Sequence, residues 1–214
     1  MLTMIPAPCL PNALVRLLQA ERGVALIEFA YSLPIVLAIG FGGLETANLA
    51  LANLKVNQIA ETVADNAGRV TSGIDESDIN EVFAGALQIG QSINFQANGR
   101  IVLSSLQDNG LTGTKKGQMI NWQRCTGNLT GVAPSYGAQG KGKADATLQY
   151  MGPSTRQIAS LPNTAVMFVE VTYNYDSLIP GYPDRTVRYE SAFNVRERTN
   201  QNITNTQSLT VNSC

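Results

Sequence analysis

A glycine and a glutamate, Gly23 and Glu28, stand at the start of a long apolar run. A carboxylate inside a membrane segment costs roughly 2.5–3.5 kcal/mol on insertion scales, so such a residue needs a partner. Cleavage of the chain after Gly23 would make Val24 the new amino terminus, whose ammonium would lie one helical turn from Glu28. The spacing therefore predicts that a separate enzyme hydrolyses the Gly23–Val24 bond. The new ammonium would then pair with the Glu28 carboxylate, within one chain or between neighbouring subunits.

The residues around this bond follow a recognisable spacing. Arg22 precedes Gly23, and Glu28 and Phe29 complete the pattern Gly-x-x-x-x-Glu-aromatic between a basic leader and an apolar helix. This pattern resembles the prepilin-peptidase site of type IV-class pilins. The wider segment of residues 22–60 resembles the TadE-like family, which comprises minor pilins or pilus-assembly proteins of the tight-adherence (Tad) system. The resemblance implies that residues 1–23 are a cytoplasmic leader removed by a prepilin peptidase.

The element that carries this site is an apolar helix, which we expect to cross a membrane over residues 24–52. Arg16 and Arg22 precede it, which favours a cytoplasmic amino terminus and a periplasmic remainder in the bacterial inner membrane. The expected protein is single-pass, and its incorporation into an extracellular pilus is compatible with this topology. A buried core helix of a soluble protein is the alternative interpretation of the same run.

Two features inside the run concern how the helix bends and packs. Pro34 cannot donate a backbone hydrogen bond, so we expect a kink or an open turn there. Small side chains recur every four residues and form a stripe that would let neighbouring helices approach closely. The stripe consists of Ala38, Gly42, Thr46 and Ala50. Glycine is also common in membrane helices in general, so the stripe has a second, simpler interpretation.

Beyond the membrane the pattern becomes amphipathic over residues 53–73, and Ser72 and Gly73 end the helix. Residues 74–214 predict an α+β head domain. Acidic residues open a second helix at about residues 75–87, and four period-two segments predict an antiparallel sheet with helices on one face. The expected strands are residues 100–106, 119–125, 165–175 and 186–195. Asn98 and Gly99 form a hairpin-type turn signal.

Residues 126–164 are too long for an idle loop, so we expect an interaction surface or partial disorder. The cysteines fall on both sides of the proposed cut. Cys9 lies in the leader, which leaves Cys125 and Cys214 as a pair that an oxidising compartment would join by a disulfide. Two unrelated thiols are the alternative. The tail from Thr199 should fray unless Cys214 is bonded, and Trp122 reads as a core aromatic.

The composition argues against several classes of function. The formal net charge is −1, with 15 basic and 16 acidic residues, so no nucleic-acid-binding surface is indicated. The sequence has no histidine, the commonest general base and metal ligand. We therefore expect that the chain is not an enzyme, has no catalytic residues and binds no metal or cofactor.

The sequence favours a minor pilin or pseudopilin of a Tad-type pilus, processed by prepilin peptidase. Its expected partners are the membrane, other pilus subunits and Tad assembly proteins. The alternative is an uncleaved single-pass membrane protein that recruits pilus components through its periplasmic head.

Overall fold

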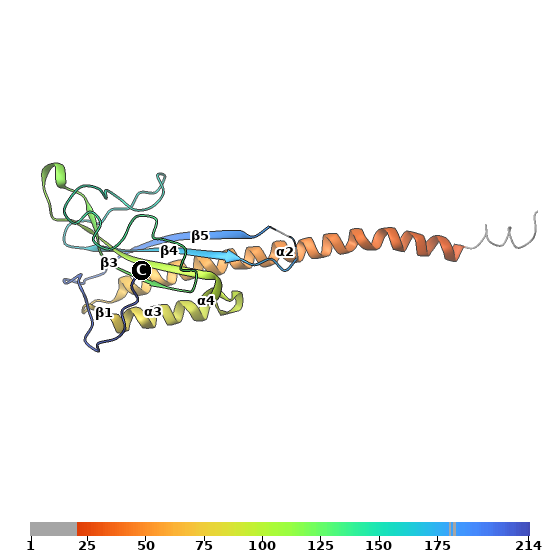
Figure 1. Cartoon of the computed structure of the whole chain (residues 1–214), viewed down its shortest axis with the longest axis horizontal. Coiled ribbons are helices and arrows are strands. Elements are labelled where there is room, and N and C mark those ends of the chain that lie inside the picture. The colour runs from red at the N-terminus through yellow and green to blue at the C-terminus, as the bar shows by residue number, and fades with distance from the viewer. Residues whose placement is uncertain (1–20, 180, 182) are drawn as a thin grey trace, which may run out of the picture. The chain divides into compact units, whose positions relative to one another are not determined.

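The computed structural model of the protein describes residues 21–179, 181 and 183–214. The chain divides into two compact units, residues 1–47 and Asn48–Cys214, of which the first is described from residue 21. The predicted leader, with Cys9 and Arg16, lies largely outside the described residues. The α+β class is confirmed, because a long apolar helix is followed by a small antiparallel sheet (Figure 1).

The long helix α2 covers Glu21–Arg69, and its residues 48–69 belong to the second unit. In that unit Val56, Ile59 and Val63 are completely buried, as their spacing of three and four predicts. The next helix, α3 (Glu76–Ile89), begins at Asp75, whose side chain accepts a hydrogen bond from the backbone N–H of Ser77. Asp75 and Asp78 form a capping box, which fixes the start of α3.

The turn predicted at Asn98 and Gly99 is wrong. After a short 3₁₀ turn η1 (Gln91–Ile93), helix α4 (Phe95–Asn98) ends at Asn98, and Gly99 already begins a strand with extended backbone. A side chain at Gly99 would come within 2.6 Å of Phe95, so this glycine provides space for the Phe95 ring. A dipeptide that often makes hairpins here makes a close approach between helix and strand instead.

The sheet contains four antiparallel strands in the order β3-β2-β4-β5. Its strands are β2 (Gly99–Asp108), β3 (Gln118–Thr126), β4 (Ala165–Tyr175) and β5 (Arg185–Asn194), with a 3₁₀ turn η2 (Gly113–Lys115) between the first two. All four strands were predicted, and their ends differ from the prediction by two residues at most. A separate two-stranded parallel pair joins β1 (Ile74–Asp75) to β6 (Ile203–Thr204).

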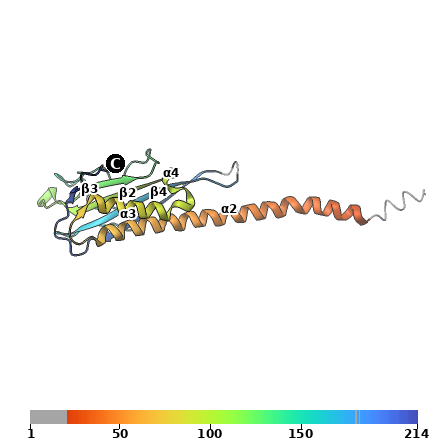
Figure 2. The same ribbon diagram turned by 90° about the horizontal axis from the view of Figure 1, so that it is seen from below.

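Each face of the sheet packs against a different part of the second unit. On one face, here called the helix face, α2 and α3 pack over the strands (Figure 2), and Val63, Phe83 and Val169 belong to one buried cluster. The opposite face, the loop face, is covered by the segment between β3 and β4, where Leu148 and Met151 pack on Phe168. The expectation of partial disorder in residues 126–164 is therefore wrong, because this segment carries apolar side chains that build a second core.

Candidate membrane anchor and processing site

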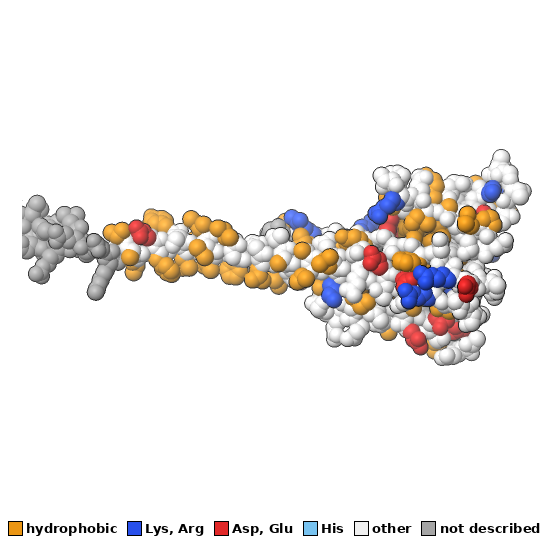
Figure 3. Space-filling model, turned by 180° about the vertical axis from the view of Figure 1, so that it is seen from behind, with side chains coloured by type: hydrophobic (Ala, Val, Ile, Leu, Met, Phe, Trp, Pro, Cys, Tyr) orange, Lys and Arg blue, Asp and Glu red, His pale blue; other side chains and the backbone are white. Residues whose placement is uncertain are grey.

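The described part of the first unit is an apolar helix whose side chains are mostly exposed. Figure 3 shows hydrophobic side chains along the visible face of this part of α2. The exposed large side chains include Val24, Leu26, Ile27, Phe29, Tyr31, Ile35, Val36, Leu37, Ile39, Phe41 and Leu44. Among the described residues, Gly23–Arg69 is the one helix long and apolar enough to cross a membrane by length and composition. A membrane location is consistent with this surface, since so much exposed apolar area is unfavourable in water.

The residues of the predicted processing site lie together near the beginning of α2. The Gly23–Val24 bond is inside the helix, and no atom lies within 4 Å of the place where a Cβ of Gly23 would be. Glu28 is exposed one helical turn after Val24, and Val24 and Phe29 are 57% and 62% exposed. The site is thus open to another protein. Hydrolysis would require local unwinding, which glycine makes easier by about 1 kcal/mol relative to alanine.

Pro34 lies inside α2, and helix is assigned without interruption on both sides of it, so the kink stays a prediction. The hydroxyl of Ser32 donates to the carbonyl oxygen of Phe29 at 3.2 Å, one of the local bonds that can accompany a proline in a helix.

The stripe of small side chains is exposed along α2. Ala38, Gly42, Thr46 and Ala50 are all exposed. The Thr46 hydroxyl donates to the carbonyl oxygen of Gly42 at 2.8 Å, so this polar group is satisfied within the helix. The stripe therefore needs no polar partner, and close helix packing along it stays a prediction.

Comparison with known families identifies this part of the chain. Residues 23–65 match the family model described as TadE-like protein. This segment is TadE-like. The match begins at the glycine of the candidate cleavage site and ends within α2, so it includes none of the sheet. No curated protein and no solved structure matches the chain. The TadE-like segment suggests a Tad pilus-related protein.

The second unit contains the predicted disulfide. Cys125 on β3 and Cys214 are joined, with their Cα atoms 5.0 Å apart and a sequence separation of 89. The tail is held beside β3, because the Cys125 N–H donates to the Asn212 carbonyl oxygen at 2.8 Å. Trp122 is buried, as predicted, and its indole N–H donates to the carbonyl oxygen of Gln201 at 3.0 Å. Because Cys214 is bonded, the tail from Thr199 is not expected to fray.

Arg124 and Arg198 are two of the three buried arginines among the described residues, and neither was foreseen from the sequence. The Arg124 Nε on β3 donates to both carboxylate oxygens of Glu76, at 2.8 and 3.0 Å, and ties β3 to the first turn of α3. Arg198 donates to the carbonyl oxygens of Ala67 and Val70 at the end of α2, and burial lowers its pKa. The acidic first turn of α3 signalled a helix start, but the partner of Glu76 is 48 residues away in the chain.

A polar group lies beneath the covering segment on the loop face. Burial raises the pKa of Glu170 on β4, although the Ser135 N–H donates to its Oε1 at 2.9 Å. Its other carboxylate oxygen has no hydrogen-bond partner among the described residues. The Tyr136 hydroxyl donates to Glu190, and burial together with that carboxylate raises the pKa of Tyr136 to about 12.

Proposed function

We propose that the chain is a minor pilin or pseudopilin of a Tad-type pilus that a prepilin peptidase cleaves after Gly23. The observation that carries this proposal is the position of the TadE-like match, which begins at Gly23 and includes Glu28. Glu28 is the one charged residue between positions 24 and 44, and its side chain is exposed on an apolar helix. The chain's role in this proposal is structural and not enzymatic.

The geometry supports a pairing that cleavage creates. Residues four apart on a helix are neighbours on its surface. After cleavage the Val24 ammonium could contact Glu28 of the same chain, or of the next subunit if the two anchors pack side by side. A buried charge without a partner is strongly unfavourable, so pairing between subunits would also fix their register. In this proposal the head lies in the periplasm or on the pilus, and the amino terminus is made in the cytoplasm.

Determining the amino terminus of the protein isolated from membranes tests the cleavage directly. Intact-mass measurement should find a chain beginning at Val24, and any other first residue would refute this cut. Gly23→Ala should abolish processing, because a methyl group is added at the bond to be hydrolysed. Gly40→Ala is a matched control, since Gly40 also lies in α2 with no atom within 4 Å of an added Cβ. It should be processed like the wild type.

Glu28→Ala separates processing from assembly. The variant should be cleaved but should enter pili at less than about a tenth of the wild-type level, because the Val24 ammonium then lacks its partner. Glu81→Ala removes an exposed carboxylate on α3 and serves as the control that assembles normally. Equal pilus incorporation of the two variants would contradict the proposed pairing.

A second candidate keeps the anchor and omits the cleavage. It is favoured by the helical backbone at the Gly23–Val24 bond, because peptidases usually need an extended substrate and this bond would have to unwind first. The chain would then be a single-pass assembly protein that recruits pilus components through its head. A membrane-resident protein that still carries Cys9, detected as one reactive thiol in the denatured unreduced chain, would favour this version.

A further inference from the structure

The two edges of the sheet differ in how their backbone groups are satisfied. On β3, alternate N–H groups point away from β2, and each of them has a partner in the chain. Gln118 donates to the Leu148 carbonyl oxygen at 2.7 Å, Ile120 to that of Lys141 at 3.0 Å, and Cys125 to that of Asn212 at 2.8 Å. Gln123 donates to the side-chain oxygen of Gln139 at 3.1 Å. The outer edge of β3 is therefore covered.

The other edge strand, β5, has no such cover. The Val195 N–H donates to the Ala165 carbonyl oxygen, and this bond sets the alternation of the β4–β5 ladder. It follows that Thr186, Arg188, Glu190 and Ala192 direct their backbone N–H and C=O groups away from β4. No backbone group of these four residues bonds to any described residue. The middle of β5 thus presents an open row of donors and acceptors.

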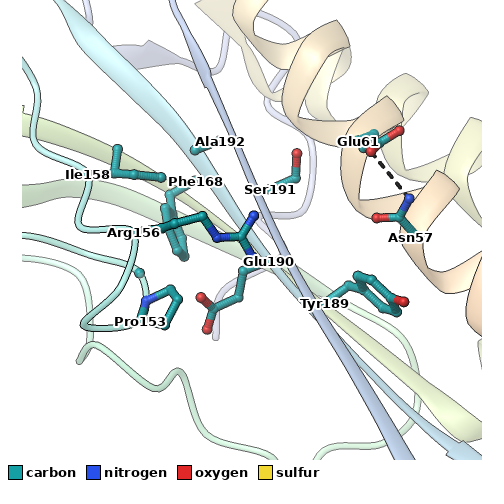
Figure 4. Close-up of a pocket in the computed structure, with 11 residues that line it drawn as sticks. Asn57, Glu61, Pro153, Arg156, Ile158, Phe168, Tyr189, Glu190, Ser191 and Ala192 are labelled. Atoms are coloured by element: carbon teal, nitrogen blue, oxygen red, sulfur yellow. Dashed lines mark hydrogen bonds between the residues drawn. The ribbon is translucent and has the colours of Figure 1, made fainter.

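A hollow of about 340 Å³ lies along this open row. Figure 4 shows β5 running between α2, which contributes Asn57 and Glu61, and the covering segment, which contributes Pro153, Arg156 and Ile158. Glu190, Ser191 and Ala192 of β5 line the same hollow. A trough with a strand edge along it and side chains on both sides has the form that an added strand requires.

A symmetric pair of two β5 edges would set residues 48–69 of the two copies in opposite directions. Residues 48–69 of α2 run alongside the strands in both views (Figures 1 and 2). Antiparallel pairing of two β5 strands about a two-fold axis would point these helices in opposite directions. The two Asn48 residues, where the chain enters this unit, would then lie at opposite ends of the pair. We therefore take a segment of another protein as the occupant, and the side chains that line the trough define its chemistry.

The side chains beside the edge define the chemistry of that segment. Arg188 donates to the Ser135 hydroxyl at 2.6 Å, and Glu190 accepts from Tyr136 at 3.0 Å, so both have partners. The Arg156 guanidinium has no hydrogen bond or ion pair with any described residue. It shares a second hollow, of about 530 Å³, with Arg188 and Glu190, so the lining of this second hollow carries an excess of one positive charge, whereas Glu61 lines only the first hollow. An acidic side chain fits there.

Ala192, four residues after Arg188 on β5, is the apolar position of this edge. Ile158, Phe168 and Ala192 line the first hollow and offer an apolar surface on the loop face. Because side chains alternate along a strand, the residues that face Ala192 and Arg188 stand four apart on one face of the added segment. We propose that the β5 edge receives an extended segment of another protein, with an apolar side chain facing Ala192 and an acidic side chain facing Arg188. The site does not depend on cleavage at Gly23.

The test uses the full-length chain in detergent micelles and a capped synthetic heptapeptide. The peptide has isoleucine at position two, serine at four, glutamate at six and threonine elsewhere, and its reversed sequence covers the other strand direction. Amide hydrogen exchange read by NMR should slow at least tenfold at Arg188, Glu190 and Ala192 with one of the two peptides. The Tyr189 and Ser191 amides, which point to β4, should not change.

Charge reversal tests the acidic side chain separately. In Arg156→Glu a peptide with lysine at position six should bind at least tenfold more tightly than the glutamate peptide, the reverse of the wild-type order. Lys115→Glu, at an exposed lysine remote from β5, should keep the wild-type order. The proposal is overturned if neither peptide slows exchange at these amides up to about 5 mM, where binding would be weaker than about −4 kcal/mol. Binding that ignores the charge at position six would overturn the acidic specificity.

Discussion

The β3 side and the β5 side of the head are two edges of one sheet that are finished in different ways. The β3 side is closed by the disulfide, by the Glu76–Arg124 pair and by backbone bonds from the tail and the covering segment. The middle of the β5 side has charged residues and a hollow instead. Charges such as Arg188 and Glu190 discourage unspecific pairing at an open edge. The comparison indicates that the stabilising contacts are concentrated at the β3 edge, whereas the β5 edge leaves backbone groups open to a partner.

The strongest way to break this contrast is to release the tail from β3. Cys214→Ser should lower the free energy of unfolding of the head by about 4 to 5 kcal/mol, since the crosslink spans 89 residues. Urea unfolding followed by the fluorescence of Trp122, the one tryptophan in the chain, measures this in full-length protein. Cys9→Ser is the matched control and should leave the midpoint unchanged. A drop below about 1 kcal/mol would show that the β3 side does not depend on the disulfide.

A smaller loss should follow from breaking the ion pair that joins β3 to α3. Glu76→Gln leaves Arg124 buried without its carboxylate and should destabilise the head by about 3 kcal/mol. The same substitution at the exposed Glu190, beside β5, should cost less than about 1 kcal/mol. Denaturation midpoints of the two variants give the comparison. Equal losses would mean that the two sides carry stability alike.

The tail also depends on pH through Asp75, whose pKa is held well below the usual range by hydrogen bonds from Thr206, Thr204 and Ser77. A lowered folded pKa means that this stabilisation is complete above the ordinary carboxyl pKa. It is lost as the pH falls toward the folded pKa. Asp75→Asn should therefore be less stable than the wild type at pH 7, and the difference should shrink in strong acid. A difference that stays constant with pH would contradict the role of the charge.

The smallest expected effect is of opposite sign and concerns Glu170, beneath the covering segment next to β5. Burial raises its pKa, with the nearby Glu190 acting in the same direction and Ser135 and Arg188 opposing it. The contribution of Glu170 to the stability of the head is fully present below the ordinary carboxyl pKa. It is lost as the pH rises through the raised folded pKa. Glu170→Gln should then raise the unfolding midpoint slightly at pH 7 and change nothing in acid. A lower midpoint at pH 7 would show that the charged form is the stabilising one.

The parts of the molecule that the sequence predicted are those with local causes. The bounds of β4 follow from a run of β-branched and aromatic residues, and the start of α3 follows from the Asp75 cap. The cleavage pattern at Gly23 and Glu28 is also local, and cleavage there stays a prediction.

Apart from the Cys125–Cys214 disulfide, which the cysteine count indicated, features that join distant parts of the chain could not be predicted. The order of strands decides that β5 and not β4 is an edge, and it arises because β4 returns to pair with β2. The partner of Glu76 and the hollow near Arg156 depend on the same long-range arrangement. The hairpin turn predicted at Gly99 was wrong because this glycine makes room for Phe95, which is a tertiary contact.

The pairing of β4 with β5 has a mechanical consequence. The two strands are joined from Val166 and Asn194 to Tyr175 and Arg185 without a register shift. Antiparallel hydrogen bonds run perpendicular to the strands. Forces that pull β4 and β5 in opposite directions along their length would load all of these bonds together in shear and would not unzip them in turn. The β4–β5 pair thus resists the sliding of one strand past the other.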